Sequence, residues 1–104
     1  MNPNISALYT IAKKPERVII GLMSGTSVDG LDVALCRISG QGTQTNVQLL
    51  AFETVVYNKG FKEHIKSVFS KRNVDLEKVC LLNAWVGTEH ASIILSCLKK
   101  WNID

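Results

Sequence analysis

Three apolar runs in the first half of the sequence are joined by short connectors, which limits how they can pair. The runs are residues 17–23 (RVIIGLM), 31–38 (LDVALCRI) and 47–57 (VQLLAFETVVY). Their β-branched and aromatic residues favour strands. Parallel strands need a crossover of about a dozen residues or more, and neither connector is that long. The sequence therefore predicts an antiparallel meander of three strands.

The three predicted strands differ in the burial that their residues indicate. The continuous apolar run at 17–23 predicts a buried central strand. In residues 31–38 both faces are largely apolar, which predicts a layer on each side. Residues 47–57 are long enough for an edge or next-to-edge strand.

Apolar side chains follow a helical period in the second half of the chain. Phe61, Ile65 and Val68 lie on one face of a predicted amphipathic helix. Asp75 is expected to be the N-cap of a second, longer helix that reaches Trp101. Its apolar surface extends well beyond one stripe, so we expect it to be largely buried in a larger body. The fold class is α/β: an antiparallel three-strand meander followed by two helices.

Three residues of the long predicted helix need an explanation of their own. Asn83 lies on its most apolar stripe, which predicts a buried amide with hydrogen-bond partners. Gly87 costs about 1 kcal/mol relative to alanine in a helix, so we expect close packing there. His90 is interpreted as a packing histidine with a satisfied ring and not as a ligand.

Composition excludes several classes of protein. The 104 residues are 46% hydrophobic with a net charge of +3, and the basic residues form no dense stripe of the kind that nucleic-acid binding needs. No stretch approaches the roughly 18 apolar residues that span a membrane, and the start lacks the pattern of a signal peptide. Cys36, Cys80 and Cys97 form no Cys-x-x-Cys pair and are interpreted as buried, reduced thiols. We therefore expect a cytoplasmic protein without a nucleic-acid or membrane partner.

The loop between the first two predicted strands, Met23–Asp32 (MSGTSVDGLD), has the strongest chemical signal. Gly25 and Gly30 permit backbone angles closed to other residues and let a ligand approach the main chain. Asp29-Gly30 is a hairpin-turn dipeptide. Successive backbone N–H groups and the hydroxyls of the loop could hold phosphate oxygens. Two aspartates, Asp29 and Asp32, could orient a hydrated magnesium ion.

A simpler interpretation of the same loop is a tight turn without a ligand, because Gly, Ser and Asp are common turn residues. Two known phosphate motifs are absent from it. There is no Gly-Lys-Ser/Thr of a P-loop and no Gly-x-Gly-x-x-Gly that opens a helix. From residue types alone, the plain turn and the phosphate nest both stay open.

The segment 20–33 (IGLMSGTSVDGLDV) closely resembles the opening signature of anhydro-N-acetylmuramic acid kinases, a bacterial family in peptidoglycan recycling. The Leu82-Asn83…Gly87 spacing and the helix ending in LKKW are also similar to the family. The resemblance covers nearly all of residues 18–104, but only the first part of a family chain several times longer. It implies an actin-like ATPase fold, with paired ribonuclease-H-like domains around an ATP cleft. Residues 17–104 would be an incomplete amino-terminal domain and residues 1–16 an amino-terminal arm.

The resemblance also implies an activity. Family members use ATP to phosphorylate the 6-oxygen of 1,6-anhydro-N-acetylmuramic acid while water opens the anhydro ring, which gives N-acetylmuramic acid 6-phosphate and ADP. A carboxylate base activates the water. In the family, this base and a Ser-His-Gly-Gln-Thr-like stretch near the sugar lie beyond the position of residue 104. We therefore expect no catalytic residue in this chain.

In the family the first hairpin is a phosphate loop, and the resemblance carries ATP contacts onto matching positions here. Asp29 and Asp32 are in addition the expected contacts of magnesium, through water. The expected ATP-binding residues are Gly25, Thr26, Ser27, Val28, Asp29, Gly30, Leu31 and Asp32.

Other functions stay open beside the kinase. A nuclease of the same fold needs a carboxylate on its first strand to bind metal, and residues 17–23 contain none. A truncated, non-catalytic module that binds nucleotide or serves as a scaffold is the main alternative, because catalysis in this fold needs two domains to close around the substrates. The expected partner is a small anhydro amino sugar, and a homodimer is kept open.

Overall fold

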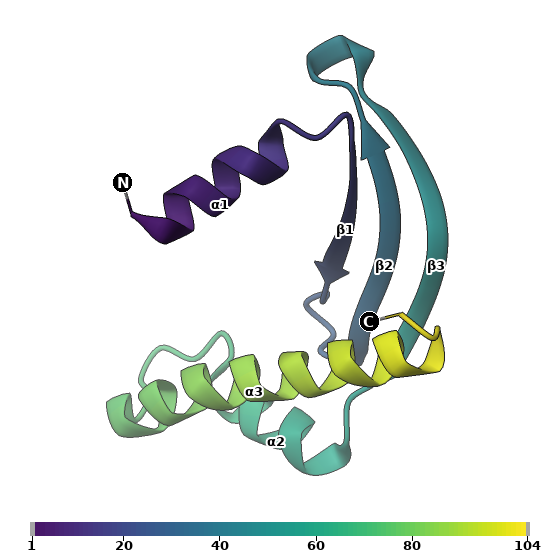
Figure 1. The fold of residues 1–104 in the computed structure, drawn as a ribbon. Coiled ribbons are helices and arrows are strands. Elements are labelled where there is room, and N and C mark those ends of the chain that lie inside the picture. Colours follow the sequence, from purple (N-terminus) through teal and green to yellow (C-terminus); the bar gives the residue numbers. More distant parts are fainter. Residues whose placement is uncertain (1, 104) are drawn as a thin grey trace. The chain divides into compact units, whose positions relative to one another are not determined.

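The structure is a computed structural model that describes residues 2–103. From residue 16 onward its long elements follow the predicted order of three strands and then two helices, and a helix that was not predicted precedes them (Figure 1). Its helices and strands are α1 (Pro3–Ala12), β1 (Glu16–Met23), β2 (Gly30–Ser39), the short 3₁₀ helix η1 (Gly42–Gln44), β3 (Asn46–Val56), α2 (Lys59–Val68) and α3 (Leu76–Lys100).

The strands form one sheet in the order β1-β2-β3, which confirms the predicted meander. The prediction that residues 17–23 form a central strand is wrong for this chain, because β1 lies at an edge of the sheet. Of its residues, only Arg17 and Ile20 are half-buried, and the rest are exposed. An apolar run indicates that the faces of a strand can be buried. It does not specify whether the strand has a neighbour on each side, because strand pairing depends on the rest of the fold.

Strand β2 is buried on one face only. Leu31, Val33 and Leu35 are buried, whereas the alternate residues of this strand are half-buried. The predicted layers on both faces are therefore only partly present. Strand β3 lies at the other edge of the sheet, as its length indicated.

The chain divides into two compact units, residues 1–21 with 34–52 and residues 22–33 with 53–104. In the first unit, the Arg17 guanidinium donates hydrogen bonds to the carbonyl oxygens of Ala12, at 3.2 Å, and Gly40, at 2.8 Å. The first bond attaches the end of α1 to β1, and the second attaches β1 to the residue that follows β2. No described side chain of α1 is buried, so packing adds little to this helix.

The core of the second unit joins α2 to α3 and to Tyr57, the residue that follows β3. Phe61 of α2 is almost fully buried, with its ring centroid 4.9 Å from that of Tyr57 and 5.4 Å from that of Trp85. The amphipathic helix predicted around Phe61 is confirmed, and it begins where the Asn58 side chain accepts a hydrogen bond from the Phe61 N–H. Such a cap satisfies an amide that the helix itself leaves unpaired.

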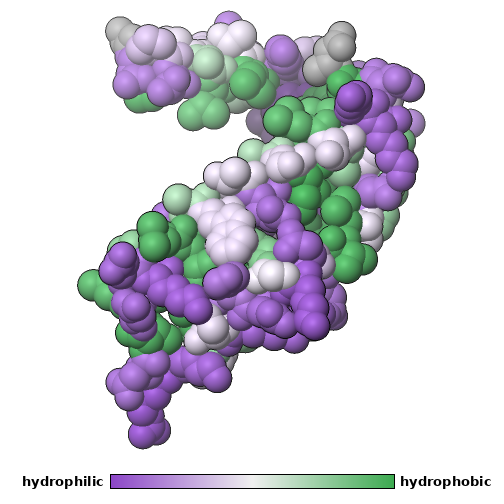
Figure 2. Space-filling model, turned by 90° about the horizontal axis from the view of Figure 1, so that it is seen from below, coloured by the Kyte–Doolittle hydropathy of each residue, from purple (hydrophilic) through white to green (hydrophobic). Residues whose placement is uncertain are grey.

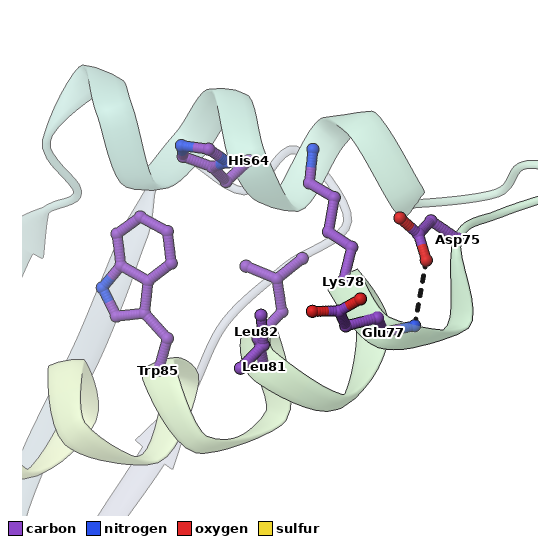
Figure 3. Close-up of a pocket in the computed structure, with 7 residues that line it drawn as sticks. All are labelled: His64, Asp75, Glu77, Lys78, Leu81, Leu82 and Trp85. Carbon is purple, nitrogen blue, oxygen red and sulfur yellow. Dashed lines mark hydrogen bonds between the residues drawn. The ribbon is translucent and has the colours of Figure 1, made fainter.

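Helix α3 begins as its sequence predicts. The Asp75 carboxylate accepts a hydrogen bond of 3.0 Å from the Glu77 N–H, and it is drawn as a dashed line in Figure 3. Along the helix, however, only Leu82, Ile93 and Cys97 are buried. The expectation of a largely buried helix is therefore not met by the part of the chain that the structure describes.

Three residues of α3 differ from their predicted environments. Asn83 is exposed and not buried. A Cβ added at Gly87 would meet no described atom within 4 Å, so the expected close packing is absent within residues 2–103. Cys80 is also exposed, while Cys36 is half-buried and only Cys97 is buried as predicted. Figure 2 shows hydrophobic residues, in green, at the surface of the face that it draws.

None of the helices in residues 2–103 combines the length and the hydrophobicity that a membrane span requires.

Candidate functional site

The loop between β1 and β2 is a tight turn with a strained residue at its end. The Val28 N–H donates to the Gly25 carbonyl at 3.1 Å, and the reversal is centred on Thr26 and Ser27. Val28 has φ of 55° and is 6% exposed. A β-branched residue at positive φ is an outlier that persists only where its surroundings impose it.

The structure corrects the roles expected of the two glycines. Positive φ falls on Val28 and not on Gly25 or Gly30, and Asp29-Gly30 is not the turn dipeptide because Gly30 already begins β2. Glycine is required at position 30 for a different reason: the backbone of Val55 lies so close that an added Cβ would be 2.5 Å from its carbonyl oxygen. A Cβ at Gly25 would meet only the Ser27 hydroxyl, at 4.0 Å, so the loop is open on that side.

The middle of the turn presents two backbone amides without a backbone partner among the described residues. Within the described residues, no backbone carbonyl accepts a hydrogen bond from the N–H of Thr26 or Ser27. Both residues are exposed, and each has a hydroxyl beside its amide. Adjacent amides that are exposed in a turn can together bind an anion.

Asp29 is ion-paired to helix α2. Its Oδ1 atom lies 2.7 Å from the Lys62 ammonium, and 68% of its side chain is exposed. The hydrogen bond from Lys62 is the largest cause that lowers the pKa of the Asp29 carboxyl, followed by the Ser27 side chain and by the charge of Lys62. Asp29 is therefore ionised at neutral pH, as a ligand of a hydrated cation must be.

Asp32 has a different environment. It is half-buried on β2 and accepts a 2.8 Å hydrogen bond from the Thr54 hydroxyl on β3. Because side chains alternate along a strand, Asp32 lies on the face opposite Leu31, whose side chain is 1% exposed in the core. Of the predicted ATP-binding residues, Leu31 and Val28 can therefore offer a ligand only their backbone.

The two carboxylates suit a hydrated magnesium ion by their chemistry, since Mg²⁺ prefers oxygen ligands and keeps several of its waters. The described residues contain no group of three or more side chains that could enclose a metal ion. The donor set of two carboxylates therefore suits a water-mediated contact more than a full coordination cage.

Sequence reasoning missed two residues that hold the loop, Lys62 and Tyr57. The Tyr57 hydroxyl lies 3.1 Å from the Ser24 hydroxyl and 2.9 Å from Nε2 of His90. His90 is thus a half-buried histidine with a polar partner, as predicted. Tyr57 ends the third apolar run, so pairing that run in the predicted meander would have placed it near the loop.

Two hollows adjoin these elements. A pocket of about 260 Å³ next to the loop is lined by Val28 and by residues of α2 and α3. A second pocket, of about 400 Å³, lies between α2 and α3, where the rings of His64 and Trp85 have centroids 5.0 Å apart (Figure 3). Only the first is next to the turn that carries the predicted phosphate contacts.

The meander with two following helices is the arrangement of the amino-terminal part of sugar kinases with the actin-like ATPase fold. A family model described as anhydro-N-acetylmuramic acid kinase matches residues 17–104. The chain belongs to this family.

Several relatives carry the same name as the family. The anhydro-N-acetylmuramic acid kinase of Pseudoalteromonas atlantica is 62% identical over 99% of this chain, and that of Pseudoalteromonas translucida is 51% identical over 100%. The protein of this name from Caldanaerobacter subterraneus is 40% identical over 89% of the chain. The chain spans about a quarter of the length of these relatives: 26% of the first two and 24% of the third.

Proposed function

We propose that this chain supplies the first phosphate-binding loop of an ATP-dependent kinase that acts on 1,6-anhydro-N-acetylmuramic acid. The reaction transfers the terminal phosphoryl group of ATP to the 6-oxygen of the sugar while one water molecule opens the anhydro ring. Its products are N-acetylmuramic acid 6-phosphate and ADP. Membership of the anhydro-N-acetylmuramic acid kinase family and the names of the relatives support this reaction.

The turn itself is the observation on which the proposal rests. Thr26 and Ser27 present adjacent backbone amides for which no described carbonyl is an acceptor, and the buried Val28 follows them directly. Preorganised N–H groups stabilise the charge of a phosphoryl group without reorganising during the reaction. The open side at Gly25 leaves room for phosphate oxygens to approach the main chain.

In this proposal, residues 25–32 contact ATP, with Val28 and Leu31 acting through their backbone. Asp29 and Asp32 would hold a magnesium ion through its waters, and that ion would neutralise phosphate charge when bound. No carboxylate of this chain is assigned as the base that activates water. Within the described residues Asp29 is ion-paired to Lys62, and Asp32 accepts a hydrogen bond from Thr54.

The proposal also covers the domain organisation, the cellular location and the oligomeric partner of the protein. Residues 17–104 form part of one ribonuclease-H-like domain of a two-domain kinase, and residues 1–16 form an arm that precedes it. We propose a cytoplasmic enzyme, since its sugar substrate arises in peptidoglycan recycling, with a second copy of the protein as a candidate partner.

The test uses the complete gene product that carries this chain. ADP release should depend on the anhydro sugar, and Thr26→Ala and Asp29→Asn should each lower kcat/KM for ATP about tenfold or more, because they remove charge-assisted contacts to phosphate or magnesium. Thr88→Ala, at an exposed position of α3, is the matched control and should leave kcat/KM unchanged.

Two results would contradict the kinase proposal. Full activity of both loop variants would show that the turn only reverses the chain. Binding of ADP without any turnover of the sugar would favour the alternative, a nucleotide-binding or structural module of the same fold.

A further inference from the structure

Tyr57 contacts both ends of the loop between β1 and β2. Its backbone N–H donates to the Asp29 carbonyl at 3.0 Å, just before β2 begins. Its hydroxyl donates to the Ser24 hydroxyl at 3.1 Å, just after β1 ends. Tyr57, which is only 5% exposed, therefore holds both residues that flank the turn, Ser24 and Asp29.

The Tyr57 hydroxyl is itself held by helix α3. His90 Nε2 lies 2.9 Å from it, and the two rings are stacked within 10° of parallel with centroids 6.0 Å apart. Phe61 packs on the tyrosine ring from α2. A buried hydroxyl with two polar partners and a packed ring has little freedom to move, so the Ser24 end of the loop is fixed to the helical layer.

The inner side of the turn rests on the same cluster. Val28, whose positive φ is imposed by its surroundings, lines a pocket together with Tyr57, Phe61 and His90. The amides of Thr26 and Ser27 lie between the Ser24 and Asp29 contacts in the sequence. Their direction thus depends on how rigidly those two contacts are held.

From these contacts we propose that Tyr57, held by His90, is a positioning residue for nucleotide binding: it sets the direction of the turn amides without touching the nucleotide. This inference rests on the proposed function of the loop. A small displacement of preorganised donors weakens phosphate binding, because such sites depend on donor geometry.

Tyr57→Phe in the complete gene product is the main test, since it removes one hydroxyl and keeps the ring. Binding of ADP with magnesium, measured by calorimetry, should weaken about three- to tenfold, the effect of losing one hydrogen bond. The KM for ATP should rise in step, while the KM for the anhydro sugar stays unchanged. Tyr9→Phe, at an exposed tyrosine of α1, is the matched control and should bind ADP as the wild type does.

Ser24→Ala and the double variant separate positioning from general stability. If the Tyr57–Ser24 hydrogen bond acts as a unit, Ser24→Ala with Tyr57→Phe should weaken ADP binding no more than Tyr57→Phe alone. His90→Gln, which keeps a hydrogen-bonding group, should bind ADP more tightly than His90→Phe, which does not. These variants also decide the question if Tyr57→Phe does not fold.

A lower melting temperature with unchanged ADP binding in Tyr57→Phe, or in both Ser24→Ala and His90→Phe, would overturn the inference and leave only a structural role. If the wild type neither binds ADP nor consumes ATP with the sugar, the proposed function fails and the inference falls with it. If the wild type does both and the variants bind ADP equally well, the inference alone fails.

Discussion

The ammonium of Lys62 lies 2.7 Å from Oδ1 of Asp29 and joins helix α2 to the loop that carries the predicted phosphate contacts. The two residues are 33 positions apart in the sequence. The pair keeps Asp29 ionised and occupies one of its oxygens, so it fixes both the charge and the direction of this carboxylate.

Lys62→Met should raise the pKa of the Asp29 carboxyl toward its ordinary value, because Lys62 is the main cause of its lowering. The stabilisation from this pair is present above the unfolded-state pKa and is lost as the pH falls through the lower folded-state pKa. NMR titration of the Asp29 carboxyl measures the shift. Lys59→Met, on the same helix but paired to Glu63, is the control. An Asp29 titration curve identical to the wild type would refute the assignment.

Gly30→Ala should destabilise the complete gene product by about 1–3 kcal/mol, because overpacking forces the backbone apart. The added Cβ would lie 2.5 Å from the Val55 carbonyl oxygen, which cannot turn away as a flexible side chain could. Gly25→Ala is the matched control, since its Cβ would meet only the Ser27 hydroxyl at 4.0 Å. Urea unfolding compares the two variants, and equal midpoints would contradict the close approach.

Alkylation at pH 8 should modify Cys80 before Cys97, by about tenfold or more in rate, because the exposed thiolate is the reactive form. Cys80 is exposed. Burial, and secondarily the charge of Glu53, raise the pKa of the Cys97 thiol. Mass spectrometry of peptides at successive times gives the order. Faster labelling of Cys97 than of Cys80 in the folded protein would contradict the exposed position of Cys80 and the buried position of Cys97.

Residues 1–104 expressed alone should associate as their concentration rises, because large apolar side chains on α3 are exposed. Leu81 is 64% exposed and Leu95 65%. Exposed apolar side chains favour contacts between copies. Leu95→Lys should reduce the association seen by light scattering, and Ser92→Lys, which adds the same charge at an exposed polar position, should reduce it less. A concentration-independent monomer would count against this prediction.

For residues 17–104, the sequence by itself determined the three strands, the two long helices, their order and the place of the loop. Strand and helix periods, the Asp75 cap and the short connectors are local properties, and the structure confirms each of them. The ordered signature around Met23–Asp32 also indicated the family, which the match over residues 17–104 shows.

Only the tertiary structure decided which residues support the loop and which surfaces are covered. Lys62 and Tyr57 meet loop residues 33 positions away, and no local pattern encodes such a pairing. Positive φ fell on Val28 although glycines stood on either side of it, because burial and the adjoining strands fix the angles there. The edge position of β1 and the exposure of Asn83 follow from the same cause: burial depends on which elements pack alongside a residue, and its neighbours in sequence do not specify them.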